Sequence, residues 1–242
     1  METISLKKKV IWITGASKGI GAAIAHRLSD TGATLILSSS SENSFTKLKA
    51  EFASNNNIYF FPFNLGDENE AKLCFEKIQN QFGGVDILIN NAGVVSFLSL
   101  LKTPLEVFNE IMNVNLRGAF LCIQSVLPDM LEKKSGIILN IVSVVAIKTF
   151  RNNSIYSASK AGLLAMSRSL REEVRGQGIK VVDILPGATE TEAWSEEDRE
   201  KFHELVMQPD DVAETVYNAL LLSQNDRLHL EEIRVRPQKG DL

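Results

Sequence analysis

Hydrophobic and polar positions follow two alternating patterns along the chain. Short runs rich in Val, Ile and Leu, typical of buried strands, are separated by longer stretches in which apolar residues recur every three or four positions. The series Ile20, Ile24 and Leu28 is one example of this helical spacing. The pattern predicts strands at residues 10–13, 34–37, 58–63, 85–89, 136–142, 179–185 and 228–235.

Helical stretches fill the intervals between these strands. Asp67 has a side chain that favours the position just before a helix, and Pro104 suits a first helical turn. The helices are predicted from about residue 20 to 28, and at 45–52, 67–82, 104–115, 118–133, 154–175, 196–207 and 209–222.

The alternation of strands and helices predicts the fold class. Strands linked through helices form parallel pairs with right-handed crossovers. We therefore expect an α/β fold with a doubly wound, mostly parallel seven-stranded sheet and helices on both faces, as a single domain over residues 1–242. In such a sheet, ligands bind at the carboxyl ends of the strands.

Composition and charge narrow the function classes. A chain of 242 residues, 44% of them hydrophobic, suffices for one large domain, and a net charge of −4 argues against a nucleic-acid partner. Cys74 and Cys122 lack disulfide or zinc-site spacing, and the histidines are scattered, so we expect no metal site and a cytoplasmic location. No apolar stretch approaches the ~20 residues of a membrane span.

Three glycines follow the first predicted strand, in the segment 14–21. Gly15 permits a tight turn, Gly19 permits close approach by a ligand, and Gly21 permits the helix to pack on the strand. The exposed N–H groups at the helix start could bind a diphosphate. Glycine-rich turns also occur for steric reasons alone, but the position between a strand and a helix favours a nucleotide site.

Tyr156 and Lys160 are four residues apart in a predicted helix and therefore share one face. An ammonium beside a phenol favours the phenolate and lowers its pKa, which would make Tyr156 a proton donor and acceptor. A surface tyrosine with a solvated lysine is the alternative. Other strand ends carry Asn90–Gly93, Ser143 and Pro186–Gly187, each of which could also be an ordinary turn.

Together these residues resemble the short-chain dehydrogenase/reductase family, in its single-domain branch, which includes ketoacyl-acyl-carrier-protein reductases and carbonyl reductases. The resemblance implies a Rossmann-like fold and the catalytic residues Asn115, Ser143, Tyr156 and Lys160. The cofactor-binding residues that it implies, together with those expected from the phosphate argument below, are Gly15, Ser17, Lys18, Gly19, Ile20, Gly21, Ser38, Ser39, Ser40, Asn64, Leu65, Asn91, Ala92, Gly93, Tyr156, Lys160, Pro186, Gly187, Thr189 and Thr191.

The resemblance also implies a reaction. A hydride passes between a nicotinamide cofactor and a ketone or secondary alcohol, and Tyr156 gives or takes the oxygen-bound proton. Ser143 bonds the same substrate oxygen, while Lys160 lowers the tyrosine pKa and binds the nicotinamide ribose. Asn115 is expected to hold a water that links Lys160 to solvent.

The second strand indicates which cofactor is used. It runs into Ser38–Ser41, and the first acidic residue is Glu42, whereas NAD-selective folds place an acid directly after this strand. Hydroxyls can donate to a 2′-phosphate, and Lys18 can reach it as a point charge. We therefore predict NADP(H) rather than NAD(H).

The C-terminal part departs from the ketoacyl reductase pattern. Only the segment 188–208 is available as a lid over the site, and Trp194, Phe202 and Leu205 either line a pocket or pack together. The chain lacks the V-D-G-G ending of many relatives, yet the helices at 104–133 and 154–175 could pair, so a homodimer or homotetramer is expected. The apolar residues expected near the cleft, which suit a ketone or alcohol, are Val94, Val95, Phe97, Val145 and Phe150, with Ser96 among them.

Two other readings stay open. A cofactor-binding sensor or scaffold without turnover would share the fold, but it has no need of the full set of four catalytic residues. Reduction of a ketoacyl group on a carrier protein is a narrower enzymatic alternative, and it would need a basic patch beside the cleft, which the sequence does not clearly supply.

Overall fold

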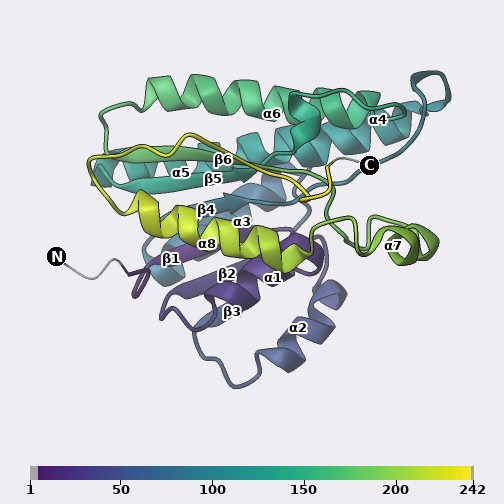
Figure 1. Cartoon of the computed structure of the whole chain (residues 1–242). Coiled ribbons are helices and arrows are strands. Elements are labelled where there is room, and N and C mark those ends of the chain that lie inside the picture. The colour runs from purple at the N-terminus through teal and green to yellow at the C-terminus, as the bar shows by residue number, and fades with distance from the viewer. Residues whose placement is uncertain (1–4, 241–242) are drawn as a thin grey trace.

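The computed structural model describes residues 5–240, and its strands form one parallel sheet (Figure 1). The strand order is β3-β2-β1-β4-β5-β6-β7, so the direction of winding reverses between β1 and β4. The predicted doubly wound α/β fold is confirmed. The strands are β1 (Val10–Thr14), β2 (Thr34–Ser38), β3 (Ile58–Phe60), β4 (Ile87–Asn90), β5 (Gly136–Ile141), β6 (Ile179–Pro186) and β7 (Glu232–Val235).

Helices cover both faces of the sheet. Apolar residues of α1, α2 and α8 form one core with the first face, and those of α3, α5 and α6 form a second core with the other (Figure 1). None of the described helices is both long and apolar enough to cross a membrane. The helices are α1 (Gly19–Leu28), α2 (Thr46–Glu51), α3 (Glu68–Phe82), α4 (Leu105–Met112), α5 (Ala119–Lys133), α6 (Ser154–Glu173), α7 (Glu196–Phe202) and α8 (Pro209–Ser223).

Local chemistry fixes several helix ends. The Asp67 carboxylate accepts hydrogen bonds from the N–H groups of Asn69 and Glu70, which confirms it as the cap of α3. Gly83 ends the same helix in the left-handed conformation, with φ of 76°.

Some predicted boundaries differ from the structure. The helices predicted at 104–115 and 118–133 are joined by a π-helical turn, Asn113–Gly118, into one continuous helical run. The helix predicted to reach residue 207 ends at Phe202, because the chain then turns back and the Met207 N–H bonds the Ala188 carbonyl. The last strand begins only at Glu232.

A buried polar network ties α6 to the middle of the sheet. Asn90, Asn140 and Asp183 are register partners on β4, β5 and β6, and the Asn140 amide nitrogen donates to Asp183 at 3.1 Å. Arg171 of α6 donates to Asp183 at 2.7 Å, and Ser167 of α6 donates to it at 2.6 Å. Burial raises the pKa of Asp183, and these hydrogen bonds and the Arg171 charge oppose the rise.

Removing the cation from this network should destabilise the protein strongly. Arg171→Met leaves Asp183 buried without its charge partner, so we expect a loss of about 3–5 kcal/mol in the free energy of unfolding, measured by urea denaturation. Arg175→Met is the matched control, because Arg175 pairs with Glu172 at the surface, and a much smaller loss is expected. An equal loss of unfolding free energy in the two variants would show that the buried ion pair stabilises the fold no more than the surface pair does.

Candidate functional site

A cleft of about 1060 Å³ opens at the carboxyl ends of the strands. Its walls come from the loops after β1, β2, β4, β5 and β6 and from the start of α6, as a doubly wound sheet requires. It brings together all of the sequence-predicted site residues except Gly21 and Asn115, which do not line it.

Close backbone contacts shape the glycine-rich turn between β1 and α1. Gly15 has φ of +62°, and a Cβ there would lie 2.6 Å from the Ala92 Cα. A Cβ on Gly21 would collide with the Gly15 carbonyl oxygen. Gly21 is therefore a packing residue, as predicted, and its absence from the cleft wall follows from that role.

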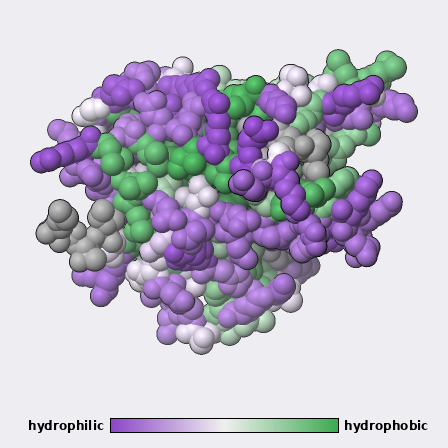
Figure 2. All heavy atoms as spheres, viewed as in Figure 1, coloured by the Kyte–Doolittle hydropathy of each residue, from purple (hydrophilic) through white to green (hydrophobic). Residues whose placement is uncertain are grey.

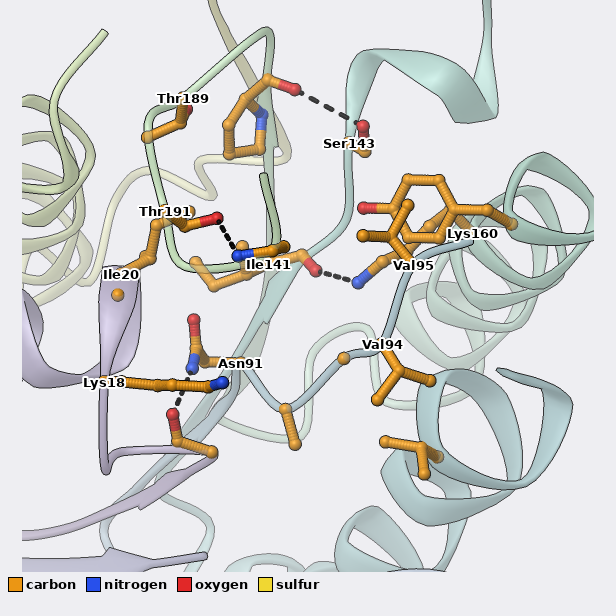
Figure 3. Close-up of a pocket in the computed structure, with 18 of the residues that line it drawn as sticks. Lys18, Ile20, Asn91, Val94, Val95, Ile141, Ser143, Lys160, Thr189 and Thr191 are labelled. Atoms are coloured by element: carbon orange, nitrogen blue, oxygen red, sulfur yellow. Dashed lines mark hydrogen bonds between the residues drawn. The ribbon is translucent and has the colours of Figure 1, made fainter. Parts of the chain in front are cut away.

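The Asn91 side chain braces the ends of β1 and β4. Its amide nitrogen donates to the carbonyl oxygens of Thr14 and Gly15, each at 3.0 Å. The Thr14 hydroxyl oxygen accepts the N–H groups of Asn91 and Ala92 at 3.1 and 3.2 Å. Figure 3 shows Asn91 and Lys18 on one side of the cleft and Ser143 and Lys160 on the other. These bonds hold the glycine-rich turn against the end of β4.

Ser143 and Tyr156 form the polar pair of the site. Ser143 follows β5, and its hydroxyl accepts the Val145 N–H at 3.3 Å and donates to the Pro186 carbonyl at 3.5 Å. Burial raises the pKa of Tyr156 to about 12, and a hydrogen bond with Ser143 opposes this rise. Tyr156 is therefore a neutral phenol at neutral pH.

Lys160 points at the main chain rather than at the phenol. Its Nζ donates to the Ile141 carbonyl at 2.8 Å, as Figure 3 shows, and lies 5.9 Å from the Tyr156 ring centroid. Burial lowers the pKa of Lys160 to about 8. The prediction that Lys160 lowers the tyrosine pKa is not met in this structure, because desolvation of the phenol has the larger effect.

Asn115 lies in the π-helical turn and is almost completely buried. Its side-chain oxygen accepts the Val94 N–H at 2.8 Å, and its amide nitrogen donates to the Val94 carbonyl and the Ser159 hydroxyl at 2.9 and 3.0 Å. Ser159 in turn donates to the Tyr156 carbonyl. Asn115 thus links the segment after β4 to the helix that carries Tyr156; a water relay through it stays a prediction.

The serines after β2 divide between two environments. The Ser38 hydroxyl accepts the Trp12 Nε1–H at 2.8 Å inside the core, so its side chain is committed there and only its backbone can reach a ligand. This differs from the expectation that Ser38 offers a hydroxyl to a phosphate. Ser39 instead donates to Ser17 at 2.9 Å and accepts from Ser44 at 2.9 Å, and all three line the cleft.

The lid segment, residues 188–208, is held at both ends. Met207 donates to the Ala188 carbonyl and accepts the Glu190 N–H, so the segment leaves and returns at one point. The Trp194 ring lies 6.2 Å from that of Phe202, and Trp194 lines the cleft whereas Phe202 and Leu205 do not.

Sequence reasoning missed several cleft residues. Ser44 lies in a short 3₁₀ helix after the serine run, and Glu192 lies beside Gly19. Asn153, one helical turn before Tyr156, is a buried polar residue in the wall, and its position on the tyrosine's helix face was the available signal. The expected apolar residues that do line the cleft are Val94, Val95, Phe97, Val145 and Phe150, without Ser96.

Metal ligands do not gather anywhere in the described part of the chain. Within residues 5–240, no group of three or more His, Cys, Asp or Glu side chains is arranged to hold a metal ion. Both cysteines are free and buried.

Comparison with known proteins identifies the family. Residues 9–201 match the family model described as short chain dehydrogenase. An uncharacterised oxidoreductase from Staphylococcus aureus strain MW2 is 32% identical over 235 residues, which cover 96% of this chain and 98% of that protein.

Solved structures agree in fold. A metagenomic short-chain oxidoreductase in complex with NADP is 29% identical with a TM-score of 0.83, and covers 96% of this chain and 98% of its own. A variant of actinorhodin polyketide ketoreductase with NADPH is 25% identical with a TM-score of 0.87, covering 97% and 98%. The chain therefore belongs to the short-chain dehydrogenase/reductase family and is an oxidoreductase of that type.

Proposed function

We propose that this protein transfers a hydride between NADP(H) and a ketone or secondary alcohol, with Tyr156 as general acid and base. The observation that carries the proposal is the Ser143–Tyr156 pair at the cleft wall, with the buried side chain of Lys160 nearby. A binding protein without turnover has no need of this arrangement.

The cleft suits a dinucleotide. The glycine-rich turn and the segment after β4 bring backbone close to the cleft, and a Cβ on Gly93 would lie 3.4 Å from the Lys160 Nζ. A side chain at Gly93 would thus crowd the lysine that is proposed to hold the nicotinamide ribose. The nicotinamide group supplies the hydride when it is bound.

The proton chemistry follows from the pKa values. Tyr156, with a pKa of about 12, is protonated at neutral pH and can donate its proton to the oxygen of a carbonyl as that oxygen gains charge. The Ser143 hydroxyl stabilises the same oxygen by a hydrogen bond. Lys160, with a pKa of about 8, is mostly cationic at neutral pH, and its proposed role is to bind the nicotinamide ribose.

Self-association and location are part of the proposal. Apolar side chains are exposed around the loop before α4 and along α4 and α5, including Leu101, Leu105, Phe108 and Phe120. Figure 2 shows apolar atoms at the upper right, the end of the molecule where α4 lies in Figure 1. This supports a homodimer or homotetramer built on these helices. The buried free cysteines support a reducing, cytoplasmic setting.

Replacing the phenol should test the central role. Tyr156→Phe is expected to lower kcat by about 10²–10⁴-fold, because it removes only the proton donor, and to leave the Kd for NADPH nearly unchanged. Stopped-flow turnover and NADPH fluorescence titration measure the two quantities. Tyr59→Phe, at a ring that packs on Phe82 away from the cleft, is the control and should keep full turnover. A Tyr156→Phe enzyme as fast as wild type contradicts the assignment.

The direction of the pH dependence should differ between the two reactions. Alcohol oxidation needs the phenolate, so its kcat/KM should rise about tenfold per pH unit from about pH 6 to 8, below the raised pKa of Tyr156. Carbonyl reduction uses the neutral phenol and should stay nearly flat over the same range. Initial rates of alcohol oxidation and of carbonyl reduction, measured from about pH 6 to 8, would give the two pH dependences. An oxidation rate independent of pH rules out a phenol with a raised pKa as the base.

The preference for NADP(H) over NAD(H) can be tested at the serines Ser38–Ser41. The wild type is expected to have a kcat/KM at least about tenfold higher with NADPH than with NADH. Ser39→Asp should reverse this preference, because a carboxylate repels the 2′-phosphate and accepts from the 2′-hydroxyl. Ser41→Asp, in the same run but outside the cleft wall, is the control. A wild-type preference for NADH defeats the proposal.

A further inference from the structure

Asn153 carries a buried polar group that the proposed mechanism does not use. The residue is 9% exposed and lines the cleft. Its side-chain oxygen is shielded from solvent and has no hydrogen-bond partner among the residues that the structure describes. An unpaired buried polar atom lowers the stability of a protein by about 1–3 kcal/mol. Such an atom in the wall of a ligand cleft therefore indicates a functional role.

A structural role does not account for the side chain. Asn153 is the cap residue of α6, and asparagine there usually accepts an N–H from the first helical turn. No such side-chain bond is made; only the Asn153 main-chain carbonyl is used, which accepts the Ser157 N–H at 2.8 Å. The carboxamide therefore neither caps the helix nor braces another element.

The surroundings define what this carboxamide can bind. It lies three residues before Tyr156, on the same face of the helix and about 4.5 Å along its axis. Val145 and Phe150, which precede it in the sequence, line the same cleft and are apolar. A polar group in a ligand cleft selects a ligand that presents a matching group to it. A carboxamide both accepts and donates, and a hydroxyl does the same.

We propose that Asn153 binds a hydroxyl group of the substrate close to the reacting carbon, so that the enzyme acts on hydroxy ketones in preference to plain ketones. The inference rests on the proposed function, because it places the carbonyl carbon at Tyr156. It makes Asn153 a specificity-determining residue. To reach the ligand, the carboxamide turns about its terminal torsion and presents its shielded oxygen to the cleft. Substrates without the hydroxyl leave that oxygen unpaired and are used less well.

Pairs of ketones that differ only by a hydroxyl in place of a methyl group test the proposal. Hydroxyacetone is compared with 2-butanone, and 4-hydroxy-2-butanone with 2-pentanone, by following NADPH absorbance. In the wild type, kcat/KM for at least one hydroxy ketone should exceed that for its partner by about tenfold, mainly through KM. The two pairs distinguish a hydroxyl on the adjacent carbon from one a carbon further away.

Variants at this position assign the preference to the carboxamide. Asn153→Leu, of similar volume, should bring the ratio close to one, with kcat/KM for the plain ketone within about threefold of wild type. Asn153→Ala also removes the carboxamide and should also lose the preference, so it serves if the leucine variant does not fold. Asn153→Asp keeps acceptor oxygens and should retain the preference. Asn152→Gly is the control, because Asn152 is exposed, lies outside the cleft wall and has a φ of 60° that glycine accepts.

The outcomes separate the two proposals. A wild type that reduces plain and hydroxy ketones equally well, or a preference that survives in Asn153→Leu, overturns the role of Asn153 and leaves the proposed reaction intact. A wild type that reduces none of these ketones, nor oxidises the corresponding alcohols, overturns both.

Discussion

The fastening of helix α6 to the sheet is the constraint on which the site depends. This helix carries both Tyr156 and Lys160, and its later turns hold Arg171 against Asp183 on β6. Asn140 extends the same network to β5, one residue before the Ile141 carbonyl that receives the Lys160 ammonium. Ionic and polar bonds are directional, so they fix the rotation and height of the helix more closely than apolar packing alone. The positions of the Tyr156 and Lys160 side chains are therefore set by where the helix is held on the sheet.

Burial changes the electrostatics of the site from what a pair of isolated residues suggests. Removing water from Tyr156 and Lys160 favours the neutral form of each, so two pKa values that are ordinarily close together move apart, to about 12 for the phenol and about 8 for the ammonium. The lysine offsets part of its desolvation by binding the Ile141 carbonyl rather than the phenol. The geometry of this bond keeps the cation beside the reacting pair without placing it in contact with the ring.

Local physics explains why much of the architecture could be predicted from the sequence. Hydrophobic periodicity predicted the seven strands, and their alternation with helices predicted a mostly parallel sheet. The glycine spacing marked the turn whose backbone packs against Ala92. Ser38 could not be assigned in this way: period-two alternation in β2 turns it toward Trp12, and the partner on that face is known only from the fold. The unpaired oxygen of Asn153 is likewise a property of the assembled wall and not of its neighbours in sequence.

The paired ends of the lid segment make it an almost independent loop. The Met207 N–H donates a hydrogen bond to the Ala188 carbonyl, which holds the two ends of the segment together. The chain between them therefore starts beside β6 and ends beside the start of α8, whatever its length. Closing a longer loop raises the entropic cost slowly, by about 0.6 kcal/mol for each doubling. Insertions or exchanges between these two residues should thus be tolerated by the rest of the fold, which makes this loop the natural place for the ligand range to diverge while the sheet stays unchanged.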